Sequence, residues 1–132
     1  MSRGGFFAVN SLSSVHVLVV DDDPSFREAL VSVLRHCGAL VTAVSTPDAA
    51  LAAMGQVKPD VLVVTIGTNP DATLLPPHVR ARKPEEGGNA PIVAFLREGA
   101  EDGAREGINA ALTEPLNPWE LCRVISELLA MD

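Results

Sequence analysis

Short aliphatic runs separated by helix-like segments restrict the folds that this chain can adopt. The run Val61–Ile66 carries apolar or β-branched side chains on both of its faces. Strands of this kind are typical of the middle of a parallel sheet. Similar runs occur at Val15–Val20, Ala39–Ser45, Pro91–Leu96 and Ala110–Thr113. Because helical patterns lie between them, the sequence predicts βαβ units and an α/β fold with five parallel strands.

Three helices are predicted from the way they begin. In each, a residue that can cap a helix is followed by proline at the first helical position, where the missing N–H costs nothing. Gly38 and Gly55 provide stop signals for the first two helices, and an apolar stripe continues the third through residues 121–129. The predicted starts are Asp23–Pro24, Thr46–Pro47 and Asn117–Pro118.

Two other stretches favour only short helices. Residues 67–90 contain four prolines, so a helix there is expected to begin near Pro76–Pro77. Residues 97–107 contain three glycines and few apolar side chains, which predicts a short, weakly docked helix.

Composition limits the classes of function. The chain of 132 residues fits one domain, and its formal charge of −7 argues against non-specific binding to nucleic acid. No apolar run approaches the length of a membrane span. We expect residues 1–14 to be a flexible leader, residues 15–132 to form the domain, and the protein to be cytoplasmic. Cys37 and Cys122 fit no metal or disulfide framework and are expected to be small buried side chains in a reducing compartment.

Three aspartates, Asp21–Asp23, directly follow the first predicted strand. Carboxylates at that edge of a sheet suit a hard cation such as Mg²⁺. They suit a nucleotide phosphate poorly, because a phosphate-binding turn is rich in glycine and presents backbone N–H groups. The residues alone leave two interpretations open: a cation site, or a helix cap at Asp23 beside two solvated acids.

The segments "HVLVVDDDPSFREALVSVLRHCG", "TPDAALAAM" and "PDVLVVTI" resemble the receiver domain of bacterial two-component response regulators, and the likeness extends from Val15 to Met131. The resemblance implies a flavodoxin-like (βα)5 three-layer sandwich of strand order 2-1-3-4-5, with the third and fourth helices shortened here. It also implies phosphorelay signal transduction, in which a histidine kinase phosphorylates an aspartate beside bound Mg²⁺, and a cis Glu114–Pro115 peptide bond.

Most of the family's active-site residues are replaced in this chain. Asp21 and Asp22 fall on the acidic pair, but Thr65 stands at the phospho-acceptor aspartate. A threonine hydroxyl needs a neighbouring base before it becomes nucleophilic. The other substitutions are Leu96 at the switch Ser/Thr, Glu114 at the lysine and Ala111 at the usual aromatic switch position. The resemblance therefore implies a degenerate phosphorylation site, a pseudo-receiver, in which Mg²⁺ binding is weak or absent and no other cofactor is expected.

Two residues near this site are candidates for other roles. Arg97 follows the fourth strand and is the best candidate for a cation that reaches Asp21 or Asp22, although it could equally be solvated. Trp119 could anchor a partner, although covering the core at the start of the last helix is the simpler expectation.

The sequence leads us to a non-enzymatic signalling domain that acts through protein–protein interaction, on another signalling protein or in a homodimer, without direct contact with nucleic acid or membrane. One alternative is a phosphorelay receiver that keeps Mg²⁺ at Asp21 and Asp22 and is phosphorylated on another acid, such as Asp71. A second is a flavin or small-ligand domain of the same fold class, for which "TIGTN" is a weak phosphate cradle.

Overall fold

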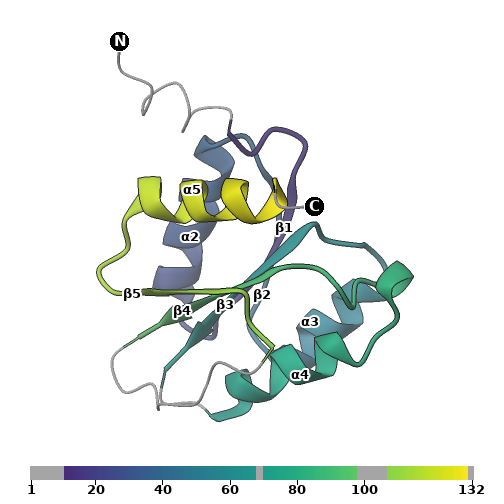
Figure 1. Ribbon diagram of the computed structural model, residues 1–132. Helices are drawn as coiled ribbons and strands as arrows, with labels where there is room; N and C mark the ends of the chain where they lie inside the picture. The colour runs from purple at the N-terminus through teal and green to yellow at the C-terminus, as the bar shows by residue number, and fades with distance from the viewer. Residues whose placement is uncertain (1–10, 68–69, 98–106, 131–132) are drawn as a thin grey trace.

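The computed structural model describes residues 11–67, 70–97 and 107–130. Five parallel strands form one sheet in the order β2-β1-β3-β4-β5 (Figure 1). This is the predicted class and strand order. The strands are β1 (His16–Val20), β2 (Leu40–Val44), β3 (Val61–Ile66), β4 (Ile92–Leu96) and β5 (Ala110–Thr113).

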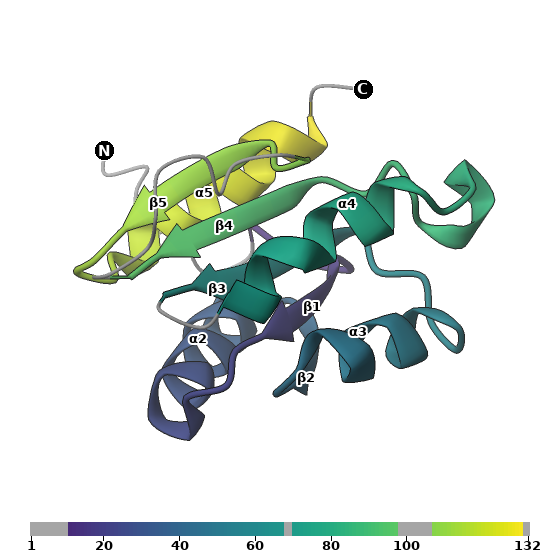
Figure 2. The same ribbon diagram turned by 90° about the horizontal axis from the view of Figure 1, so that it is seen from below.

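Helices cover both faces of the sheet, as Figures 1 and 2 show. One core lies beneath α2 (Pro24–His36) and α5 (Pro118–Leu129), and the other lies beneath α3 (Pro47–Met54) and α4 (Leu75–Arg80). Every residue of β3 is buried, which agrees with its apolar sequence and its place at the centre of the sheet. Two short 3-10 helices, η1 (Pro70–Leu74) and η2 (Pro84–Glu86), flank α4.

The predicted helix starts are confirmed. The Asp23 carboxylate accepts hydrogen bonds from the backbone N–H groups of Ser25 and Phe26, at 3.0 and 3.4 Å. Thr46 and Asn117 cap α3 and α5 in the same way, each accepting from the N–H three residues further on. These side chains satisfy donors that have no partner within the helix itself.

Of the two stretches expected to be irregular, the structure describes most of residues 67–90 but not residues 98–106. The helix expected near Pro76–Pro77 is α4, which spans six residues and is short as predicted. The fourth family helix would fall mainly on residues 98–106, outside the described residues. The cis peptide bond between Glu114 and Pro115 is present.

The expected boundary between leader and domain is wrong for residues 11–14. Leu12 is fully buried in the core beneath α2 and α5, and its N–H donates to the Cys37 carbonyl at 2.9 Å. Ser126 of α5 donates to the Ser11 carbonyl at 3.4 Å. A leucine side chain adds about 2 kcal/mol or more when it is fully buried, and this gain holds the turn against the domain.

The expectation that the cysteines are unpaired is also wrong. Cys37 and Cys122 are buried as predicted, but their sulfur atoms form a disulfide. They are 85 residues apart in the sequence and meet because α2 and α5 pack on the same face of the sheet. Spacing along the chain carries no sign of such a pairing. Within the described part of the chain, no helix is long and apolar enough to cross a membrane.

Candidate functional site: an acidic cleft at the ends of β1 and β3

The candidate site lies where the central strands end. In the register of the sheet, Val20 of β1 pairs with Val64 of β3, so the residues that follow, Asp21 and Thr65, come together at the carboxyl edge. This is the edge at which open parallel sheets bind their ligands. The cleft there has a volume of about 350 Å³ and is lined by Val20, Asp21, Asp22, Ser45, Pro47, Thr65, Gly67, Ala72, Arg97 and Glu114. The structure thus brings together four of the predicted site residues and Arg97.

Asp21 is a buried acid, only 2% exposed. One carboxylate oxygen, Oδ1, accepts the N–H of Asp23 at 2.8 Å, and Arg27 donates to the Asp21 backbone carbonyl at 2.8 Å. The other oxygen, Oδ2, is buried without a hydrogen-bond partner among the described residues. Burial raises the pKa of Asp21, and the bonded N–H of Asp23 and the nearby Thr65 hydroxyl lower it only in part. Asp22, in contrast, is exposed.

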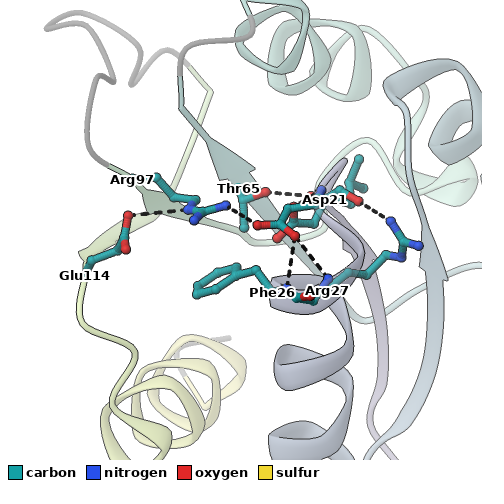
Figure 3. A network of polar contacts seen from close by, with 9 residues as sticks. Asp21, Phe26, Arg27, Thr65, Arg97 and Glu114 are labelled. Carbon is teal, nitrogen blue, oxygen red and sulfur yellow. Dashed lines mark hydrogen bonds and ion pairs between the residues drawn. The ribbon is translucent and has the colours of Figure 1, made fainter.

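Arg97 spans the cleft between two acids. Its guanidinium forms ion pairs with Asp23 at 3.0 Å and with Glu114 at 3.3 Å. Figure 3 shows the pair of Arg97 and Glu114. It also lies 4.7 Å from the centroid of the Phe26 ring, a cation–π contact, and Phe26 in turn packs on Phe95. The hydrogen bond from Arg97 is the main cause that lowers the pKa of Asp23.

This arrangement corrects the expectation for Arg97. The side chain does reach the acids after β1, but its ion pairs are with Asp23, which also caps α2, and with Glu114 beyond β5. Asp23 is therefore both the cap of α2 and an ion-pair partner of Arg97, and Arg97 connects it to Glu114. The nearby charge of Arg97 acts to lower the pKa of Asp21, although Arg97 donates no hydrogen bond to it.

Thr65 occupies the end of β3 as a largely buried side chain. Its hydroxyl donates to the Val20 carbonyl at 3.4 Å, a long contact that turns the oxygen toward β1 (Figure 3). The β-branched body suits the strand. The burial and this contact support a structural role for Thr65.

The remaining predicted residues are spread around the sheet. Leu96 ends β4 in register with Ile66 and Thr113, and packs against the core beneath α3 and α4. Ala111 lies in β5, pairs with Ala94 of β4 and is half-buried. Trp119 lies at the start of α5, is not among the residues that line the cleft, and is 55% exposed. It therefore covers the core only in part, contrary to the simpler expectation.

The donor set fits a magnesium ion poorly. Mg²⁺ takes six oxygen ligands in a near-octahedral arrangement, of which water usually supplies several and protein carboxylates one or two. The cleft offers the orphaned Oδ2 of Asp21 and the exposed Asp22 carboxylate, while Thr65 supplies a hydroxyl instead of a charged oxygen. The Arg97 guanidinium lines the same cleft and opposes a divalent cation. Among the residues that the structure describes, no group of three His, Cys, Asp or Glu side chains is placed to hold a metal.

Comparison with known proteins defines the class of the fold. No family model matches the sequence. A proposed response regulator from Chloroflexus aurantiacus superposes with a TM-score of 0.78 and 28% identity, over 89% of this chain and 99% of that one. The receiver domain of a sensor histidine kinase from Pseudomonas aeruginosa, solved with magnesium coordinated in its active-site cleft, gives a TM-score of 0.77 and 26% identity, over 89% and 99% of the two chains. The fold and these likenesses define a receiver domain of the response-regulator type.

A curated relative is similar enough in sequence to show a shared family. An uncharacterized 14.6 kDa protein in the sodA1 3′ region of Leptolyngbya boryana is 32% identical over 123 residues, which cover 90% of this chain and 93% of the relative. The chain belongs to the same family as that protein.

Proposed function

We propose that this chain is an atypical receiver domain that transmits signals by binding another protein, without phosphorylation of its own cleft. It would act in the cytoplasm, as a non-enzymatic module without direct contact with nucleic acid or membrane. The observation that carries the proposal is the Arg97 bridge between Asp23 and Glu114, which is made entirely from the chain's own side chains.

The chemistry of the cleft supports this proposal. A receiver that accepts a phosphoryl group needs a carboxylate nucleophile at the end of β3, and Thr65 stands there. It also needs a cation to balance the incoming negative charge, whereas Glu114 adds a second negative charge at the cleft and engages Arg97. An ion-pair bridge can hold α2, β4 and the β5–α5 connection in one arrangement without a ligand.

The surface for a partner is proposed at the start of α5. Trp119 is a large, half-exposed aromatic side chain, and residues of this kind often dominate the energy of protein–protein contacts. The partner in this proposal is another signalling protein, and a second copy of this chain is the other candidate. Sedimentation of the purified protein distinguishes a monomer from a homodimer.

Incubation with a small acyl phosphate and MgCl₂, followed by intact mass measurement, tests the proposal. We expect no phosphoryl adduct on the natural chain. The matched variant Thr65→Asp restores the carboxylate nucleophile and controls for donor reactivity. A stoichiometric adduct on the natural chain would overturn the proposal.

The alternative of a working phosphorelay receiver rests on Asp71. This residue lies on η1 directly beyond β3, and its neighbour Ala72 lines the same cleft as Asp21 and Asp22. If Asp71 accepts a phosphoryl group, Asp71→Asn abolishes the adduct while Thr65→Val leaves it unchanged. A colourless preparation that releases no nucleotide on denaturation would dismiss the flavin alternative.

A further inference from the structure

The Cys37–Cys122 disulfide is the one covalent link between α2 and α5. Cys37 is the C-cap residue of α2, and Cys122 lies on the buried face of α5 beside Leu121. Both residues belong to the core beneath these helices. The bond therefore fixes the end of one helix to the side of the other.

Both cysteines are buried, but their surroundings differ. Cys122 is completely buried, and Cys37, which is 2% exposed, also forms part of the wall of a surface groove of about 330 Å³. The groove runs between the end of α2 and the start of α5. Its lining is largely apolar and comprises Ser32, Val33, His36, Cys37, Pro118 and Trp119. Of the two cysteines, Cys37 is the one that lines this groove, so a small thiol in the groove meets Cys37.

We propose that the Cys37–Cys122 disulfide is a reversible redox site whose substrate is a thiol reductant that enters through the α2–α5 groove. An external thiolate attacks the Cys37 sulfur, forms a mixed disulfide there and releases the Cys122 thiolate, which takes up a proton. A second external thiol then attacks the mixed disulfide and leaves as the external disulfide, while Cys37 gains a proton. Two external thiols are oxidised and one protein disulfide is reduced, so electrons and atoms balance.

The compartment favours reversibility. Disulfides in cytoplasmic proteins are usually transient, because thiol systems there keep cysteines reduced. In the cytoplasmic location that we propose for this chain, the pair would cycle with the thiol–disulfide balance. A permanent structural disulfide would instead be expected in an oxidising compartment.

The site is well placed to change a surface. Trp119, the proposed partner anchor, belongs to the same groove and lies three residues before Cys122 on α5. The Cys37 carbonyl also receives the N–H of Leu12, so the end of α2 is a junction of three segments. Breaking the covalent link removes a constraint on the relative position of the groove walls.

The first experiment titrates the full chain in buffers of reduced and oxidised glutathione, traps thiols with an alkylating reagent and weighs the intact protein. We expect no alkylated cysteine under oxidising conditions and two under reducing conditions, which matches the chain's two cysteines. After reoxidation, the protein should again contain no cysteine that can be alkylated. Trp119 fluorescence, from the sole tryptophan, should follow the same transition. Two alkylated cysteines at every buffer ratio, or reduction only in denaturant, would overturn the proposal.

The second experiment tests the groove as the route of entry. Ser32→Trp places a bulky side chain in the groove, and Glu28→Trp adds the same side chain at an exposed position of α2 outside the groove lining. We expect Ser32→Trp to slow reduction of the folded protein by roughly tenfold, because exchange rates depend on access to the sulfur, and Glu28→Trp to leave the rate unchanged. Equal rates in both variants and the natural chain would overturn the assigned route.

These readouts do not depend on the acidic cleft. Thiol counts and reduction rates report on α2 and α5, whereas the phosphoryl adduct reports on the ends of β1 and β3. A phosphorylated chain with a reversible disulfide would refute only the proposed function, and an unphosphorylated chain with permanent thiols would refute only this inference.

Discussion

Reduction of the Cys37–Cys122 disulfide is expected to lower the free energy of unfolding substantially. The bond joins residues 85 apart, and cross-linking a loop of that length removes chain entropy from the unfolded state worth about 4.6 kcal/mol at 25 °C. For a chain of 132 residues this corresponds to a fall of about 15 °C in Tm. In urea, where such a domain loses about 2 kcal/mol per molar, the midpoint should fall by about 2 M.

The assay compares urea unfolding of the oxidised and the reduced protein, with thiol content checked by mass. Reduction is the cleanest perturbation because it changes the chain by two hydrogen atoms and leaves the core side chains in place. Cys37→Ala serves as the control, since its stability should not respond to the reductant. A difference below about 1 kcal/mol between the oxidised and the reduced natural chain would refute the argument that loop closure stabilises this fold.

Three further predictions concern the cleft and α5. Asp21→Asn should raise the free energy of unfolding at pH 7, because burial raises the pKa of Asp21 and so penalises its charged form in the folded state. In urea titrations this gain in stability should disappear below the ordinary pKa of 3.8, where the acid is neutral in both the folded and the unfolded state. Arg97→Ala should lower the free energy of unfolding by about 1 kcal/mol at low salt and by less at high salt, because it removes two half-exposed ion pairs and the contact with Phe26. Arg123→Ala removes a surface ion pair of 3.9 Å and should lower the free energy of unfolding by less in the same assay. Trp119→Ala should change the free energy of unfolding by no more than about 0.5 kcal/mol because the residue is 55% exposed, yet it should weaken binding in a pull-down of the signalling partner; an unchanged pull-down would refute the proposed surface.

The sequence predicts the fold well because its signals are local. Proline after a capping residue defines the starts of α2, α3 and α5, and the aliphatic run Val61–Ile66 coincides with β3. Strands that alternate with helices predict a parallel sheet, whereas the strand order that the structure shows was implied by the resemblance to receiver domains. Register then places Asp21 beside Thr65 with no further information.

Contacts between distant segments were predicted less well. Nothing local to Asp23 indicates that its second carboxylate oxygen pairs with Arg97, 74 residues away. The spacing of Cys37 and Cys122 along the chain does not indicate a disulfide either, because the disulfide depends on the packing of α2 and α5 on the same face of the sheet. Leu12 was missed because Ser11, Ser13 and Ser14 surround it, although an isolated leucine before the first strand is the signal that could have identified it.

The buried Leu12 also bears on how this receiver would behave inside a larger assembly. Ser11 and Leu12 are held to α5 and to the end of α2, so the chain enters the domain at an anchored point of the core. Force or rotation applied there would be delivered directly to the two helices that flank the Trp119 groove. Shortening the chain to begin at Val15 would remove that mechanical connection along with a core side chain.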